Sequence, residues 1–190
     1  MATKAPIALI LGYGRNIGAA AARRFRGLGY DVAVVSRPHG EPSSGLNPSR
    51  TAEGYLSLKA DLADTSVYAS IYAALSENFG GGAAGPDIVI FNAASVTPAA
   101  EPGNLFSVPL EGFQRDLDLN VKGAYVAARE AHRLWSASDD GKKRQFIYTG
   151  NKLATEVWPA PDFLTLGTVK NASAYLLGAA DKLYKDKGFR

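Results

Sequence analysis

Residues 7–18 read IALILGYGRNIG, and they join an unbroken apolar run to a turn that holds three glycines. The apolar run, Ile7–Leu11, predicts a strand that is buried on both faces. Residues 19–25, AAAARRF, are strong helix formers, so a helix is expected to begin at the end of the turn. Gly12, Gly14 and Gly18 therefore fall where a strand becomes a helix.

A backbone without Cβ atoms at such a junction can approach a pyrophosphate closely and place it on the unpaired N–H groups of the helix N-terminus. A second strand follows and ends at Ser36 and Arg37, which completes the unit expected around a dinucleotide. Arg15, Asn16 and Ile17 belong to the same loop. Asn16 stands where many such loops have glycine, and Asn tolerates a left-handed backbone conformation better than most residues do. The alternative is a tight strand–helix turn in an α/β protein that binds no nucleotide.

The end of the second strand favours NADP over NAD. A site for NAD usually has Asp or Glu at this position, where the carboxylate accepts hydrogen bonds from the ribose hydroxyls. Here Asp31–Val35 is followed by Ser36 and Arg37, and Arg15 is expected to project toward the same ribose. Two guanidinium groups and a hydroxyl suit a phosphate dianion, because arginine forms charge-assisted, often bidentate bonds to phosphate. Two solvated surface arginines are the simpler alternative.

The order of apolar and amphipathic segments predicts one α/β domain over residues 1–190, with a Rossmann-like, doubly wound parallel sheet. The expected strands are Ile7–Leu11, Asp31–Ser36, Tyr55–Lys59, Asp87–Phe91 and Gln145–Thr149. The expected helices cover residues 17–28, 66–79, 110–137 and 163–185. Pro38–Gly54 is predicted to be a mobile loop over the adenosine, and Gly80–Pro86 a flexible connector within the domain.

Composition narrows the class of protein. The chain has 190 residues, no cysteine and two histidines (His39 and His132), so disulfides, thiolate chemistry and a metal site are not expected. The lack of cysteine fits a reducing, cytoplasmic setting, and no segment is typical of a signal peptide or a membrane span. The net charge of +3 is modest and the basic residues are scattered, which argues against a nucleic-acid partner. The expected partner is a small-molecule substrate.

Several segments together resemble the short-chain dehydrogenase/reductase family. Gly12–Gly18 is similar to the family's glycine loop with one substitution, and Asn92-Ala93-Ala94 is similar to its Asn-Ala-Gly turn after the fourth strand. Asp61-Leu62 matches the place of the Asp that contacts adenine, and Leu119–Gly123 matches a helix segment whose Asn, here Asn120, holds a water in the proton relay. The resemblance covers the whole chain, and it implies a nicotinamide cofactor and oxidoreductase chemistry on a small carbonyl or alcohol.

The resemblance breaks at the residues that carry the family's chemistry. The family has a Ser after the fifth strand, and then a Tyr and a Lys four residues apart on the next helix; the Lys holds the nicotinamide ribose and lowers the pKa of the Tyr. Lys170 is similar to that Lys, but Leu166 stands four residues before it and cannot transfer a proton. Gly150 and Asn151 stand near the Ser position, and Asn151 can still donate a hydrogen bond to a carbonyl.

Tyr148 and Lys152 match the Tyr-x-x-x-Lys pattern literally. The pattern works on a helix, where one turn brings residues three or four apart onto one face. Tyr148 falls in a predicted strand, in which residues four apart are about 13 Å from each other. We therefore expect Tyr148 to pack on the sheet, and Tyr175, more than a turn beyond Lys170, to pack at a helix interface.

In the family, two strands and a helix follow the helix of the Lys. This sequence ends at Arg190, where the sixth strand would begin, so the resemblance implies that the C-terminal strands are missing or supplied elsewhere, for example by another subunit. The helices around 120–133 and 170–183 carry apolar faces that predict a homodimer or homotetramer. These faces include Ala124, Ala127, Ala128, Ala172, Tyr175, Leu176 and Ala179.

Two functional interpretations are open at this point. The first is an NADP-dependent reductase with an atypical active site, in which Asn120, Asn151 and Lys170 orient a water or polarise the substrate oxygen. The second is a non-catalytic NADP-binding scaffold, favoured by Leu166, that lost its proton donor. The predicted cofactor residues are Gly12, Gly14, Arg15, Asn16, Ile17, Gly18, Ser36, Arg37, Asp61, Leu62, Asn92, Ala93, Ala94 and Lys170.

Overall fold

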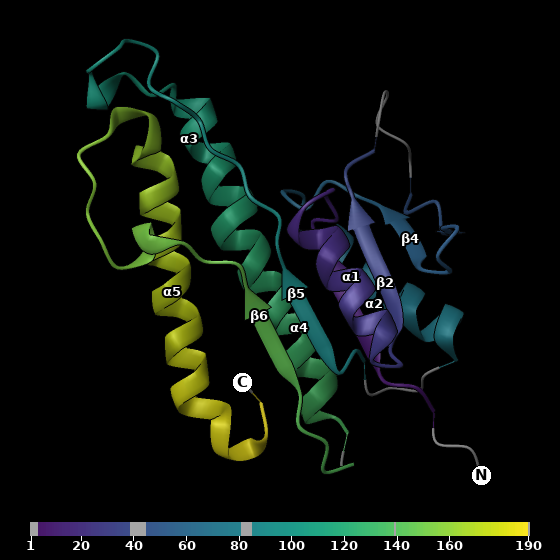
Figure 1. Ribbon diagram of the computed structural model, residues 1–190. Helices are drawn as coiled ribbons and strands as arrows, with labels where there is room; N and C mark the ends of the chain where they lie inside the picture. The colour runs from purple at the N-terminus through teal and green to yellow at the C-terminus, as the bar shows by residue number, and fades with distance from the viewer. Residues whose placement is uncertain (1–3, 39–44, 81–84, 139, 190) are drawn as a thin grey trace.

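The computed structural model describes residues 4–38, 45–80, 85–138 and 140–189. Within these ranges the chain forms a six-stranded sheet with the order β3-β4-β2-β1-β5-β6, in which all neighbours are parallel except β3 and β4. The strands are β1 (Ile7–Leu11), β2 (Asp31–Ser36), β3 (Ser49–Arg50), β4 (Leu56–Lys59), β5 (Ile88–Phe91) and β6 (Gln145–Tyr148). The expected Rossmann-like α/β fold is confirmed (Figure 1).

Helices cover both faces of the sheet (Figure 1). Helix α1 (Ile17–Gly27) packs on one face, in the same core cluster as Ile10 of β1. Helices α2 (Val67–Phe79) and α4 (Ala124–Ser136) pack on the other face, in the cluster that contains Leu11. Because successive side chains of a strand point to opposite faces, the continuous apolar run of β1 contributes to both cores.

The third expected helix consists of three segments: α3 (Leu110–Leu117), the π-helical turn η2 (Asp118–Gly123) and α4. Gly123 allows the π-helical turn to lie close to Tyr68, since a Cβ at Gly123 would stand 2.7 Å from the Tyr68 hydroxyl oxygen. This turn interrupts what the sequence predicted as one continuous helix over residues 110–137, because a π-helical turn shifts the helical pattern by about one residue. The turn matters for the candidate site because it contains Asn120.

The segment expected to be a mobile loop contains a short strand instead. Ser49 and Arg50 form β3, and they pair antiparallel with Ser57 and Leu56 of β4. A strand of two residues has no periodicity that a sequence pattern could show. Residues 39–44 of the same segment, including His39, and residues 81–84 of the expected connector lie outside the described part of the chain.

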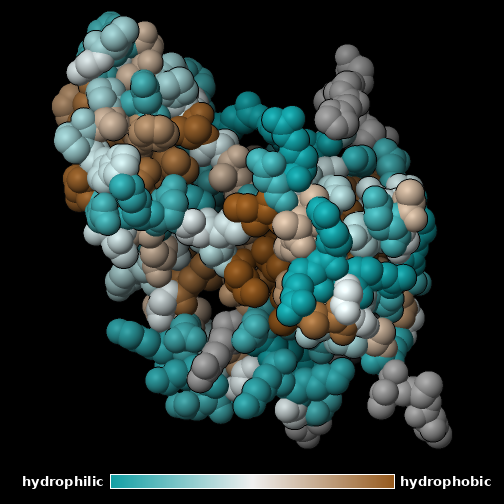
Figure 2. Space-filling view, in the orientation of Figure 1, coloured by the Kyte–Doolittle hydropathy of each residue, from teal (hydrophilic) through white to brown (hydrophobic). Residues whose placement is uncertain are grey.

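Helix α5 (Leu164–Tyr184) packs against α3 and η2. After α5 the chain returns to β6, where the Arg144 N–H donates to the Gly188 carbonyl at 2.9 Å and Phe189 forms a parallel bridge with Arg144. Ile147 on β6 is 40% exposed, and Figure 2 shows apolar surface over the middle of the face where β5 and β6 run. Short 3₁₀ turns complete the structure: η1 (Leu105–Ser107), η3 (Lys152–Ala154), η4 (Pro161–Phe163) and η5 (Lys185–Lys187).

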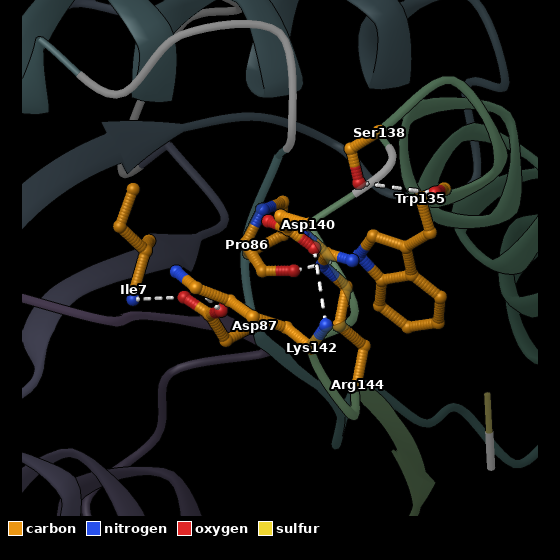
Figure 3. A network of polar contacts seen from close by, with 8 residues as sticks. All are labelled: Ile7, Pro86, Asp87, Trp135, Ser138, Asp140, Lys142 and Arg144. Atoms are coloured by element: carbon orange, nitrogen blue, oxygen red, sulfur yellow. Dashed lines mark hydrogen bonds and ion pairs between the residues drawn. The ribbon is translucent and has the colours of Figure 1, made fainter. Parts of the chain in front are cut away.

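Polar contacts join the amino ends of β1, β5 and β6 (Figure 3). The Asp87 carboxylate accepts a hydrogen bond from the Ile7 N–H at 2.9 Å and forms an ion pair with Lys142 at 3.6 Å. Arg144, which is 2% exposed, pairs with Asp140 at 2.6 Å. These contacts stabilise the end of the sheet at which the parallel strands begin, opposite to the end that carries the glycine loop.

Among the residues that the structure describes, no helix has the length and hydropathy needed to cross a membrane. The same residues contain no group of three or more His, Cys, Asp or Glu side chains arranged to hold a metal ion.

Candidate cofactor and active site

The carboxyl ends of β1, β2 and β5 border a cavity of about 250 Å³. Such a crevice is the usual ligand site of an open parallel sheet. Its lining includes these predicted cofactor residues: Gly12, Gly14, Ser36, Arg37, Asp61, Leu62, Asn92, Ala93 and Ala94. It also includes residues that were not predicted, namely Tyr13, Val35, Ala63, Ser95, Arg115 and Leu119. Outside the lining lie Arg15 and Asn16, which precede α1, Ile17 and Gly18, which begin it, and Lys170 on α5.

The three glycines of the loop have different roles. Gly12 has a φ of +96°, and a Cβ there would stand 2.3 Å from the Ala93 nitrogen, so only glycine fits between the two loops. A Cβ at Gly18 would lie 2.9 Å from the Gly12 oxygen, which shows that α1 begins in close contact with the loop. A Cβ at Gly14 would meet no atom within 4 Å. Gly14 therefore leaves open space beside the cavity rather than filling a gap in the protein.

Asn92 ties the loop after β5 to the glycine loop. Its Nδ2 donates to the Gly12 carbonyl at 2.9 Å. Its backbone N–H and that of Ala93 both donate to the Leu11 carbonyl, at 2.7 and 3.0 Å. The residues of the predicted Asn-Ala-Ala turn thus hold the cavity wall in place through their backbone as well as through the Asn92 amide.

The end of β2 carries a basic neighbour that the sequence analysis missed. Ser36 pairs with Lys59 across the parallel β2–β4 ladder, and the Lys59 Nζ donates to the Ser36 hydroxyl at 2.8 Å. Arg37 is exposed and lines the cavity. In the sequence, Lys59 is visible as a basic residue at the end of a predicted strand. Its contact with Ser36 could not be predicted, because it depends on the register of β4 on β2. Asp61, at the same edge, uses its carboxylate to accept from the Ala63 N–H at 3.1 Å.

A second polar cluster surrounds Lys170, which is 4% exposed. Its Nζ donates to the Thr149 carbonyl at 2.8 Å and to the Tyr148 hydroxyl at 3.2 Å. Burial of the ammonium group lowers the pKa of Lys170 to about 8. The lysine is therefore a partly desolvated cation held by neutral oxygens of β6 and of the residue that follows it.

Tyr148 packs on the sheet as expected, with its ring stacked on Phe91 at a centroid distance of 5.8 Å. Its hydroxyl, however, reaches this polar cluster: it lies 3.2 Å from the Lys170 Nζ and 3.5 Å from the Asn120 carbonyl oxygen. Burial raises the pKa of the Tyr148 phenol. Lys152 is not its partner, since the Lys152 ammonium lies over the Trp158 ring, 3.6 Å from the centroid.

The Asn120 side chain is fully buried in η2. Its Nδ2 donates to the Ser95 carbonyl at 3.1 Å and to the Asp116 carbonyl at 2.9 Å, while the Asp116 Oδ2 accepts from the Thr97 N–H at 2.7 Å. The Asn120 Oδ1 and the Asp116 Oδ1 are buried and have no partner among the described residues. Both side chains thus hold the loop after β5, and it is the backbone carbonyl of Asn120 that faces Tyr148.

Asn151 and Leu166 stand at the positions where the resemblance breaks. Asn151 is exposed, and its Oδ1 caps η3 by accepting from the Leu153 N–H at 3.0 Å. Leu166 lies in the first turn of α5, one helical turn before Lys170, and is half-buried. Tyr175, expected at a helix interface, is 83% exposed, so it is not buried between helices of the described part of the chain.

Comparison with known proteins identifies the family. The model of the family described as enoyl-(acyl carrier protein) reductase matches residues 12–176. Short chain dehydrogenase/reductase dmxR12 of Cryptosporiopsis sp. is 31% identical over 198 residues, which cover 97% of this chain and 74% of that protein. The chain belongs to the short-chain dehydrogenase/reductase family. It spans 58% to 59% of the length of three other short-chain dehydrogenase or dehydrogenase/reductase relatives that it matches.

Solved structures agree with the short-chain dehydrogenase/reductase fold. A short chain dehydrogenase from Burkholderia cenocepacia in complex with NADP has a TM-score of 0.75 and 24% identity, over 98% of this chain and 71% of that one. A 3-oxoacyl-[acyl-carrier protein] reductase from Brucella melitensis in complex with NAD has a TM-score of 0.79 and 20% identity, over 99% and 71%. At these identities the likeness concerns the fold, and structures of this fold hold either cofactor.

Proposed function

We propose that this short-chain dehydrogenase/reductase binds NADP and uses it to interconvert a small carbonyl compound and its alcohol. The observation that carries the proposal is the shared cavity of the glycine loop, the end of β2 and the Asn92 turn. Its residues fit a dinucleotide, because Gly14 leaves the backbone open beside the cavity while Gly12 and Gly18 are needed for internal packing.

The choice of NADP rests on the cations at the ends of β2 and β4. Arg37 lines the cavity, and Lys59 lies 2.8 Å from the Ser36 hydroxyl. No carboxylate occupies positions 36 and 37, where a site for NAD would need an acceptor for the ribose hydroxyls. A guanidinium, an ammonium and a hydroxyl in this place favour a ribose that carries a phosphate. Arg15, on the exposed turn, is a further candidate for the same phosphate.

The nicotinamide end is assigned to Lys170. An ammonium has three N–H donors, and the protein occupies two of them, with the Thr149 carbonyl and the Tyr148 hydroxyl. The third is available for a ribose hydroxyl. The cofactor, when bound, supplies or accepts the hydride. In this proposal the exposed Asn151 amide donates a hydrogen bond to the substrate oxygen, and Asn120 acts through its carbonyl on Tyr148.

Leu166 supports a second candidate function, an NADP-binding scaffold without catalysis. A leucine stands one turn before Lys170, and it offers no proton at the place where the family has its phenol. Both functions need the same cavity, and they differ only in turnover.

The decisive experiment is a titration of the purified chain with NADPH and NADH, followed by assays with a broad panel of aldehydes, ketones and enones. The reductase predicts NADPH binding at least tenfold tighter than NADH binding, and turnover of some member of the panel. The scaffold predicts the same binding without turnover. Failure to bind either dinucleotide would exclude both functions.

We also propose self-association through the outer faces of α4 and α5. Tyr125, Tyr175 and Leu183 are 50%, 83% and 65% exposed, and an apolar cavity of about 380 Å³ lies between the two helices. Two residues of the predicted interface do not belong to it, because Ala124 and Ala127 are buried in the core of the same chain. Sedimentation that shows a monomer at every concentration would remove this proposal.

A further inference from the structure

Lys170 is a buried cation without a counter-ion. It is 4% exposed, and none of the carboxylates described by the structure lies within ion-pair distance of its Nζ. A buried ammonium must be held by hydrogen-bond acceptors, or it loses its proton or its position. Two neutral oxygens do this here, the Thr149 carbonyl and the Tyr148 hydroxyl, together with the face of the Tyr148 ring, whose centroid lies 4.4 Å from the ammonium.

The Tyr148 hydroxyl is held in one orientation from two directions. Its ring stacks on Phe91 with an interplanar angle of 16°, which packs the phenol against the sheet face. The Lys170 ammonium can only donate, so the Tyr148 oxygen must accept from it. The phenolic proton is thereby directed to the Asn120 carbonyl, 3.5 Å away, which also accepts from the Ser173 hydroxyl at 3.0 Å.

The Asn120 carbonyl belongs to the π-helical turn η2. In an α-helix the Asn120 carbonyl would accept from the N–H of Ala124, four residues later. Here the Ala124 N–H donates to the Val121 carbonyl instead. The Asn120 carbonyl accepts from the Ser173 hydroxyl at 3.0 Å and lies 3.5 Å from the Tyr148 hydroxyl, on a type of turn that is frequent at functional sites.

We propose that Tyr148 is a positioning residue for Lys170: with its ring stacked on Phe91 and its proton directed to the Asn120 carbonyl, the Tyr148 hydroxyl holds the lysine ammonium in the position where the proposed function assigns it a ribose hydroxyl of the cofactor. Tyr148 lies on β6, 22 residues before Lys170 in the sequence, and it does not occupy the helical position of the family's Tyr. The ligand in this inference, NADP, rests on the proposed function. The hydrogen bond between the two side chains does not.

Other charged groups on the elements around α5 do not compete with Tyr148 for Lys170. Those with partners of their own are Asp116 on α3, Asp118 and Lys122 on η2, Glu130 and Arg133 on α4, and Lys152 on η3. The exposed ones are Glu111 and Arg115 on α3, Arg129 on α4 and Asp162 on η4. His132 packs against the Tyr184 ring at the far end of α5. The effect of removing the Tyr148 hydroxyl can therefore be measured in the titration of Lys170.

The test replaces Tyr148 with Phe, which keeps the ring on Phe91 and removes only the hydroxyl. The matched control is Tyr30→Phe, since the Tyr30 ring also packs on a phenylalanine, Phe25, at 5.1 Å, far from the cavity. The titration of Lys170 is followed by NMR of its Cε and Nζ in the cofactor-free chain, with Lys170→Met to assign the signal. An accepting oxygen stabilises the ammonium, so Tyr148→Phe is expected to lower the titration midpoint by about 1 pH unit.

The second measurement is the NADPH dissociation constant beside the unfolding temperature. Tyr148→Phe is expected to weaken NADPH binding about fivefold to tenfold at pH 8, with an unfolding temperature close to that of the unaltered chain. Tyr30→Phe is expected to change neither the Lys170 midpoint nor the affinity. An unchanged Lys170 midpoint in Tyr148→Phe would overturn the inference and leave Tyr148 as a packing residue. A chain that binds no NADPH would instead remove the proposed function, and the Lys170 midpoint would still decide the role of Tyr148.

Discussion

Lys59 and Ser36 meet across two neighbouring parallel strands, with the lysine ammonium 2.8 Å from the serine hydroxyl at the edge of the cofactor cavity. The contact adds an ammonium group to a place where Arg37 already supplies a guanidinium. The two cations lead to separate predictions about cofactor choice.

Lys59→Met should weaken NADPH binding about fivefold to tenfold, because it removes one charge from the phosphate site and keeps the length of the side chain. NADH binding should stay within about twofold. Calorimetric titration with both cofactors measures this, with Lys182→Met on the exposed face of α5 as a control of equal charge change. An equal loss for NADPH and NADH would mean that Lys59 acts through the sheet.

Arg37→Asp should cost about 1.5–3 kcal/mol of NADPH binding, the scale of lost charge-assisted hydrogen bonds plus new repulsion of a phosphate. NADH binding should change much less, since a carboxylate at this position accepts hydrogen bonds from unphosphorylated ribose. The same titrations decide the matter. If both affinities fall together, Arg37 does not contact the phosphate.

The glycines of the loop should separate stability from binding. Gly14→Ala is expected to leave the free energy of unfolding within about 1 kcal/mol and to weaken NADPH binding at least tenfold, because its methyl group enters open space beside the cavity. Gly12→Ala is expected to destabilise the fold by about 2–4 kcal/mol, because it needs a positive φ and meets the Ala93 nitrogen. Urea unfolding and cofactor titration of both variants test the contrast, which fails if Gly14→Ala binds normally.

Lys170 should make stability depend on pH. Its pKa in the folded chain is about 8, below the ordinary value of 10.5, so the unfolded chain binds the extra proton between these two pH values. The free energy of unfolding should therefore rise as the pH rises from about 8 to 10.5, because the folded chain no longer holds a buried ammonium. Below about pH 8 the folded chain carries the full desolvation penalty of the buried Lys170 ammonium.

Lys170→Met should accordingly be more stable than the unaltered chain by about 1–2 kcal/mol at pH 7, and the difference should shrink toward pH 10.5. The variant should also bind NADPH poorly. Urea unfolding at several pH values measures the first effect. A difference that is constant with pH would show that Lys170 titrates normally.

Leu166→Tyr separates the two candidate functions. The change places a phenol one helical turn before Lys170, and a general acid in position typically contributes about 10²–10⁴-fold to the rate. A chain that lost only its phenol should gain carbonyl reductase activity. A reductase with its own proton source should show turnover before the change and little gain after it.

NADPH binding of both forms must first be confirmed by fluorescence, because a displaced helix start would weaken it. If both forms bind NADPH and neither reduces any carbonyl of a broad panel, the reductase function is excluded for this chain.

The residues of the proposed cofactor cavity could largely be predicted from local sequence. The apolar run of β1, the spacing of Gly12, Gly14 and Gly18, and the basic end of β2 each depend on neighbours within a few residues. Burial on both faces requires an unbroken apolar strand, and a tight turn at φ +96° requires glycine, so these features leave a direct trace in the residue types.

The rest of the site depends on contacts between distant segments. The register of β4 on β2 brings Lys59 to Ser36, and the packing of α5 on β6 and η2 brings Lys170 to the Tyr148 hydroxyl. The sequence predicts that Tyr148 packs on the sheet, which its ring does, but it does not show that the Tyr148 hydroxyl meets the Lys170 ammonium. The type of a residue favours a local backbone conformation. The hydrogen-bond partner of the polar group at the end of a long side chain depends instead on strand register, on the placement of the helices and on the π-helical turn.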